Sequence, residues 1–139
     1  MTELYDFKTP DAGDFVVAWL LPLGACWSDT PTNKTLPYKI VNVVDDEDNV
    51  DTASSVALVS VHTYASTFGE AKAKALEAHR RMSVIADNPL TDVLLPDGSI
   101  GNVAHIRTIQ KPVKLDFGDT TIKRFVARYE LGFAFVAVS

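Results

Sequence analysis

The chain has little of what most catalytic proteins rely on. It has one cysteine, which excludes an internal disulfide, and its seven glycines are scattered singly, so it has no glycine-rich phosphate loop. None of its three histidines, His62, His79 and His105, has a second His or Cys two to four residues away, so no metal-ligand pair is pre-built. We therefore expect no enzymatic activity, no cofactor and no metal site.

Positive charge and long hydrophobic runs are also scarce. Thirteen Lys and Arg against 18 Asp and Glu give a net charge of −5, which argues against a nucleic-acid binder. The apolar run 15–27 is too short to cross a bilayer and is broken by Pro22 and Gly24. It ends in Leu-Gly-Ala-Cys, like a lipoprotein signal, but mostly acidic residues precede it where a signal peptide is basic. We expect Cys26 to be a half-buried apolar residue of a cytoplasmic fold.

What is present describes one domain over residues 1–139. Hydrophobic residues make up 47% of the chain and charged residues 22%, which is typical of a globular protein with a core. Thr9 and Pro10 predict the start of an amphipathic helix that Pro22 and Gly24 end. Its apolar face is Phe15, Val16, Trp19, Leu20 and Leu23.

Two β-prone runs follow, at 36–44 and 56–65, and predict a hairpin with a long polar loop at 45–55. That loop contains the acidic run Asp-Asp-Glu-Asp-Asn-Val-Asp (45–51). The run fails the calcium-loop pattern, because Val50 and Ala57 stand where ligands are required and Asp51 where glycine is required. A solvated, self-repelling loop is the prediction for it.

The clearest helix is predicted over 66–88, with Thr67 and Glu70 as a capping box and Pro89 after its end. Its buried stripe is Phe68, Ala71, Ala75, Ala78, Met82 and Ile85. A turn at 95–99 precedes a third strand, about 102–110, which we expect Lys111 and Pro112 to interrupt.

A long last strand, from about residue 120, alternates strictly. Phe125, Ala127, Tyr129, Leu131, Phe133 and Phe135 share one face. The order α-β-β-α-β-β predicts an α+β domain, with a mainly antiparallel sheet of about four strands packed by two helices.

Five stretches in this order resemble the tail terminator proteins of long-tailed bacteriophages, especially those that infect actinobacteria. They are AWLLPLG (18–24), LPYKIV (36–41), VSVHTYA (59–65), AHRRMSVIADNP (78–89) and RFVARYELGF (124–133). The resemblance implies a virion protein of the tail neck region, assembled in the host cytoplasm. It also implies a homo-hexameric ring that caps the tail tube, ends its polymerisation and docks the head-to-tail connector protein.

The implied partners are further copies of the chain, the tail tube protein and the connector, with DNA only passing through the ring and no membrane. A closed ring needs two different patches on each subunit. As contacts between subunits or with the tube we expect acidic and basic groups together with apolar residues near the end of the last strand. These residues are Asp45, Asp46, Glu47, Asp48, Asp51, Arg124, Arg128, Phe133 and Phe135.

Two alternatives remain open at this stage. One is another neck component, either a tail completion or a head-closure protein. The other is a small oligomeric α+β enzyme or ligand-binding domain with a pocket between subunits.

Overall fold

The structure is a computed structural model that describes residues 7–8, 11–29, 34–49, 54–116, 118–134 and 136–137. Its main sheet has the strand order β2-β3-β4-β8-β7. The strands are β2 (Cys26–Trp27), β3 (Tyr38–Asn49), β4 (Ser54–Ala65), β7 (His105–Leu115) and β8 (Lys123–Ala134). The four long strands pair antiparallel and only the short β2 runs parallel to β3. The predicted α+β class and the mainly antiparallel sheet are confirmed, with five strands where about four were predicted.

Two short strand pairs were not predicted. β1 (Phe7–Lys8) pairs with β9 (Val136–Ala137), and β5 (Val93–Leu94) pairs with β6 (Ile100–Gly101). The predicted turn at 95–99 joins β5 to β6, where the Gly98 N–H donates to the Leu95 carbonyl at 3.0 Å. Gly98 has a φ of 87°, a left-handed conformation that favours glycine.

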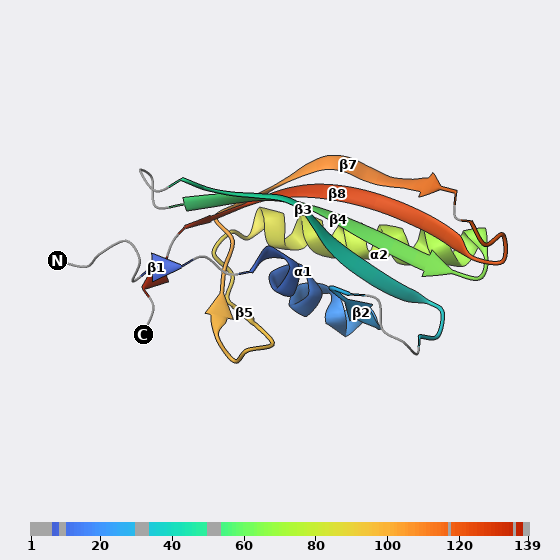
Figure 1. Ribbon diagram of the computed structural model, residues 1–139, viewed down its shortest axis with the longest axis horizontal. Helices are drawn as coiled ribbons and strands as arrows, with labels where there is room; N and C mark the ends of the chain where they lie inside the picture. The colour runs from blue at the N-terminus through green and yellow to red at the C-terminus, as the bar shows by residue number, and fades with distance from the viewer. Residues whose placement is uncertain are drawn as a thin grey trace.

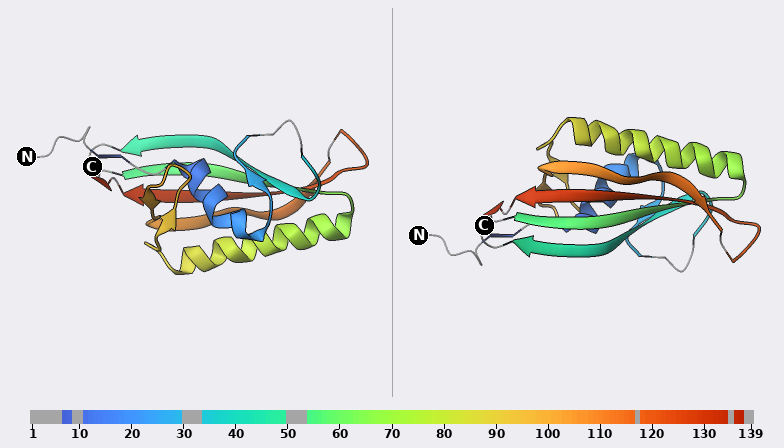
Figure 2. Two further views of the ribbon diagram at one scale, coloured as in Figure 1. Left: turned by 90° about the horizontal axis from the view of Figure 1, so that it is seen from below. Right: turned by 90° about the horizontal axis from the view of Figure 1, so that it is seen from above.

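Helices α1 (Ala12–Leu20) and α2 (Phe68–Asp87) lie on the same face of the main sheet (Figure 1). Seen from above, the strands lie in front of α1 and no helix crosses the opposite face (Figure 2). The core therefore sits between one face of the sheet and the two helices. It contains Phe15, Val16 and Leu20 of α1, Met82 and Ile85 of α2, and alternate residues of β3, β4 and β8.

The start of α1 differs from the prediction. Asp11 is its N-cap, and the Asp14 N–H donates to the Asp11 carboxylate at 2.9 Å. An aspartate caps better than a threonine, because its carboxylate also interacts with the positive end of the helix. Thr9 and Pro10 lie outside the described residues. The end is as predicted, since one 3-10 turn, η2 (Leu21–Leu23), follows and stops at Gly24.

In α2 the predicted cap is confirmed, because the Glu70 N–H donates to the Thr67 hydroxyl at 3.2 Å. The predicted stripe is buried from Ala71 to Ile85, but its first member, Phe68, is 47% exposed. Phe68 lies at the first turn, where its ring contacts Phe125 at 5.5 Å and reaches past the edge of the core.

The acidic run is not a loop. Asp45 to Asn49 continue β3 and pair with Leu58 to Ser54 of β4, so the two strands are longer than predicted. The prediction weighed the repulsion among neighbouring carboxylates, but alternate side chains of a strand point to opposite faces. Pairing to β4, which is itself paired to β8, satisfies the backbone of this segment.

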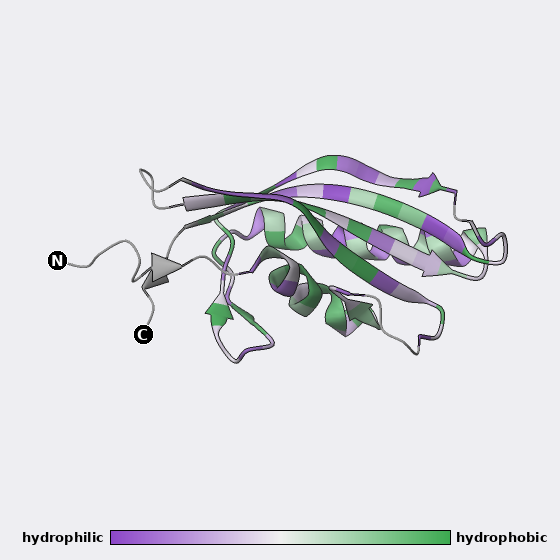
Figure 3. Ribbon diagram, in the orientation of Figure 1, coloured by the Kyte–Doolittle hydropathy of each residue, from purple (hydrophilic) through white to green (hydrophobic). Residues whose placement is uncertain are grey.

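Strand β7 also continues past its predicted end. Pro112 lies inside it, at an irregular stretch of register between Gln110 and Val113. Proline is tolerated there because β7 is an edge strand with β8 on one side only. In β8 the predicted alternation is confirmed from Phe125 to Phe133, and hydrophobic and hydrophilic residues alternate visibly along the strand (Figure 3).

Candidate interaction surface

The candidate site is the sheet face that neither helix covers, here called the open face. Strand register assigns its residues, because directly paired residues share a face. One row across the sheet is Ile40, His62, Val126 and Val113. The next rows are Tyr38, Tyr64, Arg124 and Leu115 on one side and Asn42, Ser60, Arg128 and Gln110 on the other. Ile40 and Val126 are buried although they belong to neither cluster of the core, so side chains of the open face cover them.

Aromatic rings gather at the end of the open face where β3 begins. Tyr38 stacks on Tyr64 with 4.9 Å between ring centroids, and Trp27 contacts Tyr38 at 5.9 Å. His62 lies beside Tyr64 at 6.4 Å. Offset ring contacts of this kind contribute about 0.5–1.5 kcal/mol beyond the burial of their area. This end of the open face is therefore a pre-ordered, largely apolar platform.

His62 is held neutral within this platform. Burial lowers its pKa, and the positive charges of Arg124 and Arg128 lower the pKa further. Its Nε2 shares a 3.1 Å hydrogen bond with the Ser60 hydroxyl. Its Nδ1 is buried and has no hydrogen-bond partner among the described residues. A buried polar atom without a partner costs free energy, so this nitrogen is a local cost to the stability of the platform.

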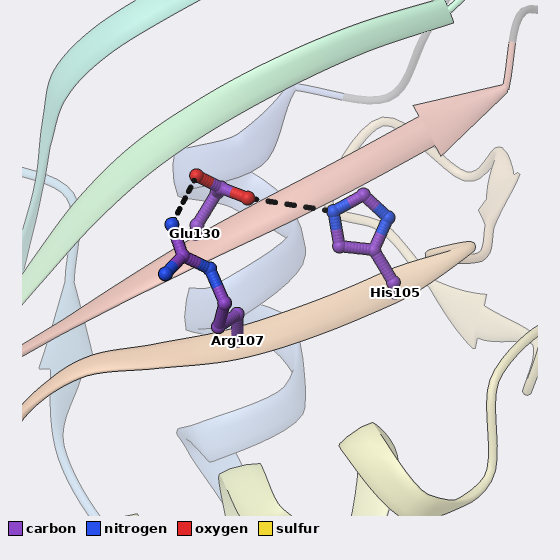
Figure 4. A network of polar contacts seen from close by, with 3 residues as sticks. All are labelled: His105, Arg107 and Glu130. Atoms are coloured by element: carbon purple, nitrogen blue, oxygen red, sulfur yellow. Dashed lines mark hydrogen bonds and ion pairs between the residues drawn. The ribbon is translucent and has the colours of Figure 1, made fainter.

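Charged residues gather toward the other end of the open face. Glu130 lies between Arg107, at 3.1 Å, and His105, at 3.6 Å (Figure 4). The hydrogen bond from Arg107 is the main cause that lowers the pKa of Glu130. The His105 ring lies on Gly132, where an added Cβ would come within 2.0 Å of a ring carbon. Glycine at this position is what allows the ring to lie against β8.

The predicted contact residues fall into separate places. Arg124 is half-buried and donates to the Asp116 carbonyl at 2.9 Å, and Arg128 is exposed on the open face. The exposed residues Asp45 to Asp48, here called the acidic strand end, lie at the far end of β3. Asp51 and Phe135 lie outside the described residues.

Phe133 is placed differently from its predicted role. It is 2% exposed and packs edge-on against Phe15 of α1, with 5.5 Å between ring centroids. Successive side chains of β8 point to opposite faces of the sheet, and Phe133 lies on the helix-covered face with Leu131 and Tyr129. A partner could reach this ring only if the core opened, so Phe133 belongs to the fold and not to the surface.

No catalytic arrangement is assembled in the described part of the chain. Cys26 is buried, and burial raises the pKa of its thiol to about 11, so it is protonated at neutral pH and is a poor nucleophile. Among the described residues, no group of three or more His, Cys, Asp or Glu is arranged so that it could hold a metal ion. Neither described helix is long and apolar enough to cross a membrane.

Sequence reasoning missed the aromatic platform and the cluster around Glu130. Both depend on register between strands far apart in the chain, such as Tyr38 with Tyr64 and Arg107 with Glu130. The sequence offered one signal. Tyr38, Ile40 and Asn42 are alternate residues of one β-prone segment, so they share the face opposite the core residues of that strand.

The comparisons with known proteins bear on the fold. No protein-family model matches the chain, and no curated protein matches it. Among solved structures, the chain is similar to a chain of the structure titled "Virion of native gene transfer agent (GTA) particle". The two are 13% identical, with a TM-score of 0.54, and the match covers 88% of this chain and 86% of the other. At this identity the likeness establishes a shared fold over most of both chains.

Proposed function

We propose that this chain is a structural virion protein that forms a ring on the end of a phage tail tube, stops its growth and docks the head connector. The observation that carries the proposal is the fold, shared over 88% of the chain with a component of a virion of a gene transfer agent. The five stretches that resemble tail terminators support it independently, because they rest on sequence and not on coordinates.

The geometry supports an assembly role over an enzymatic one. A ring subunit needs two different surfaces, because a head-to-tail contact joins unlike patches. The aromatic platform of the open face and the acidic strand end are two such surfaces, at opposite ends of β3, and they differ in character. The platform has Arg124 and Arg128 beside it on the open face, whereas the acidic strand end carries only carboxylates. Opposite charge on two patches favours one register of association.

The tail tube protein and the connector are the proposed partners, and DNA passes through the ring without being bound. An acidic chain suits that passage, because negative walls repel phosphate. Another neck component, a tail completion or head-closure protein, is the second candidate. The fold shared with a virion component supports that role equally.

Electron microscopy of particles from a phage with an amber stop in this gene distinguishes these functions. If the protein is a tail terminator, we expect full heads and unjoined tails that are overlong or variable in length. Unjoined tails of normal length would instead favour the other neck components. Normal tails joined to heads would reject both functions.

A further inference from the structure

A pocket of about 250 Å³ lies where the start of β3 meets the end of η2 and the first half of α2. Leu23, Pro37 and Tyr38 contribute apolar walls. Lys39, Thr63 and Lys74 contribute the polar groups. We call this the lysine pocket. It is large enough to hold a short polar side chain together with water.

Lys39 is unusual for its position. It points to the helix-covered side of β3, next to the core residue Val41 on the same face, and is 3% exposed. Among the described residues, no carboxylate lies within ion-pair distance of its ammonium group. A buried ammonium is costly unless it is paired with an anion.

Charge around the lysine pocket is mostly positive. Burial is the main cause that lowers the pKa of Lys39, and Lys74 also lowers it, while Cys26 and Glu77 act in the opposite direction. The Lys34 ammonium lies 5.5 Å from the centre of the Tyr38 ring, at the same end of β3. The lysine pocket is therefore lined by two ammonium groups, those of Lys39 and Lys74, with Lys34 near its end of the strand, and it matches an anion of small size.

The acidic strand end is the complementary feature of the same chain. Asp45 to Asp48 are all exposed. The pKa of Asp46 is raised by burial first and then by Asp48, Asp11 and Asp45, so these carboxylates repel one another. A cation placed among them would relieve that repulsion. They are carried by a paired strand and not by a loop, so little ordering entropy is lost when one of them binds.

The two features cannot meet within one chain. Asp48 follows Lys39 on the same strand, roughly 30 Å away at about 3.3 Å per residue. In Figure 1 the acidic strand end lies at the left end of β3 and the start of the strand lies at the right. A carboxylate of the acidic strand end can reach only the lysine pocket of another molecule.

We infer that the lysine pocket binds a carboxylate of the acidic strand end, Asp45 to Asp48, from a second copy of this chain. The contact is head-to-tail, and it rests on the proposed function because it names the subunit contact of the proposed ring. The carboxylate supplies the anion that Lys39 lacks, and Lys74 binds its second oxygen at the edge of the pocket. The apolar walls exclude water and strengthen the pair.

Carbodiimide cross-linking of an equal mixture of ¹⁴N- and ¹⁵N-labelled protein tests this contact directly, because the reagent joins only amines and carboxylates in contact. We expect mixed-label peptides that link Lys39 or Lys74 to the stretch 45–48. Mixed-label links that join other sites only would overturn the inference. A protein that stays monomeric at millimolar concentration and gives no mixed-label link would also overturn it.

Charge reversal provides the second measurement, by sedimentation velocity. Lys74→Glu and Asp48→Lys should each weaken association at least 10-fold, and the double variant should restore it. Lys72→Glu is the matched control, because Lys72 is exposed on the same helix and does not line the lysine pocket. Equal effects at positions 72 and 74 would show that association depends only on net charge, and would reject the inference.

Lys39→Met separates assembly from folding. Methionine keeps an unbranched apolar side chain, one atom shorter than lysine and without its charge, so the melting temperature should be unchanged or higher while association is lost. Rings that persist in Lys39→Met and Lys74→Glu would overturn the lysine pocket and leave the proposed function standing. The amber mutant decides that function separately, through tail length and joining.

Discussion

Trp19 and Arg81 hold α1 against α2 through two hydrogen bonds and a stacking contact. The Trp19 indole N–H donates to the Arg81 carbonyl at 2.8 Å, and the Arg81 Nε–H donates to the Trp19 carbonyl. The guanidinium carbon lies 4.0 Å from the centre of the indole ring. Because Trp19 is near the end of one helix and Arg81 is well inside the other, the pair fixes how the two helices cross beneath the sheet.

We predict that Arg81→Ala lowers the free energy of unfolding by about 1–3 kcal/mol, measured by urea denaturation. The substitution removes the cation–π contact and leaves the half-buried Trp19 carbonyl without its donor. Arg80→Ala is the control, because Arg80 is exposed on the same helix and should change stability by less than about 0.5 kcal/mol. Similar losses at both positions would mean that the pair contributes nothing specific.

The close approach of α2 to the sheet depends on its small residues. Ala75 is buried beside Ala71 and Phe125, so Ala75→Leu should overpack this contact and destabilise the protein by about 1–3 kcal/mol. Ala73→Leu is the same change on the exposed side of the helix and should be nearly neutral. Thermal unfolding of the two variants compares them, and a neutral result at position 75 would contradict the packing described here.

Stability should fall at alkaline pH through Cys26. Burial raises the pKa of its thiol from about 9 to about 11, so above pH 9 the unfolded state loses a proton that the folded state keeps. The free energy of unfolding should therefore decrease between pH 9 and 11, by about 2 kcal/mol from this group.

Cys26→Ala removes that contribution and keeps the contribution of Tyr129, whose pKa burial also raises. We expect the variant to lose less stability than the wild-type chain between pH 8 and pH 10.5 in chemical denaturation. Parallel losses in the two proteins would show that the thiol does not titrate differently on folding.

The His105 ring and Gly132 should be energetically coupled. Gly132→Ala places a Cβ where the ring lies, so the ring must leave β8 and its contact with Glu130. We expect a loss of about 1 kcal/mol, and we expect most of it to vanish in a His105→Ala background. A double-mutant cycle measures this coupling, and additive effects would contradict the packing of the ring on the glycine.

The sequence predicted the elements whose signal is local. The stripe of α2 repeats with the helical period, so that helix was predicted with nearly correct ends. The alternation of β8 was predicted from Phe125 to Phe133, although the strand begins at Lys123 and Val136–Ala137 forms a separate strand. The acidic strand end was missed because an isolated run of carboxylates favours solvent, whereas pairing with β4 holds it extended.

The candidate surfaces were predicted less well, because register and tertiary burial create them. The predicted alternation of β8 leaves Arg124 and Arg128 together on the face opposite Phe125, and the structure has them there. The aromatic platform needs Tyr38 to pair with Tyr64, and the lysine pocket needs η2 and α2 to close over the start of β3. Alternation in the segment 36–44 groups Lys39 with Val41, which was the only sequence signal that this lysine faces inward.

Pro112 bears on how the protein behaves at high concentration. An exposed edge strand is a template on which further chains can add, and β7 is such an edge with Ile109, Val113 and Leu115 exposed. Pro112 has no N–H, and the irregular register around it divides the edge into two short segments. A strand from another chain finds no continuous row of backbone partners there, so a concentrated solution of the protein is protected against fibril growth along this side.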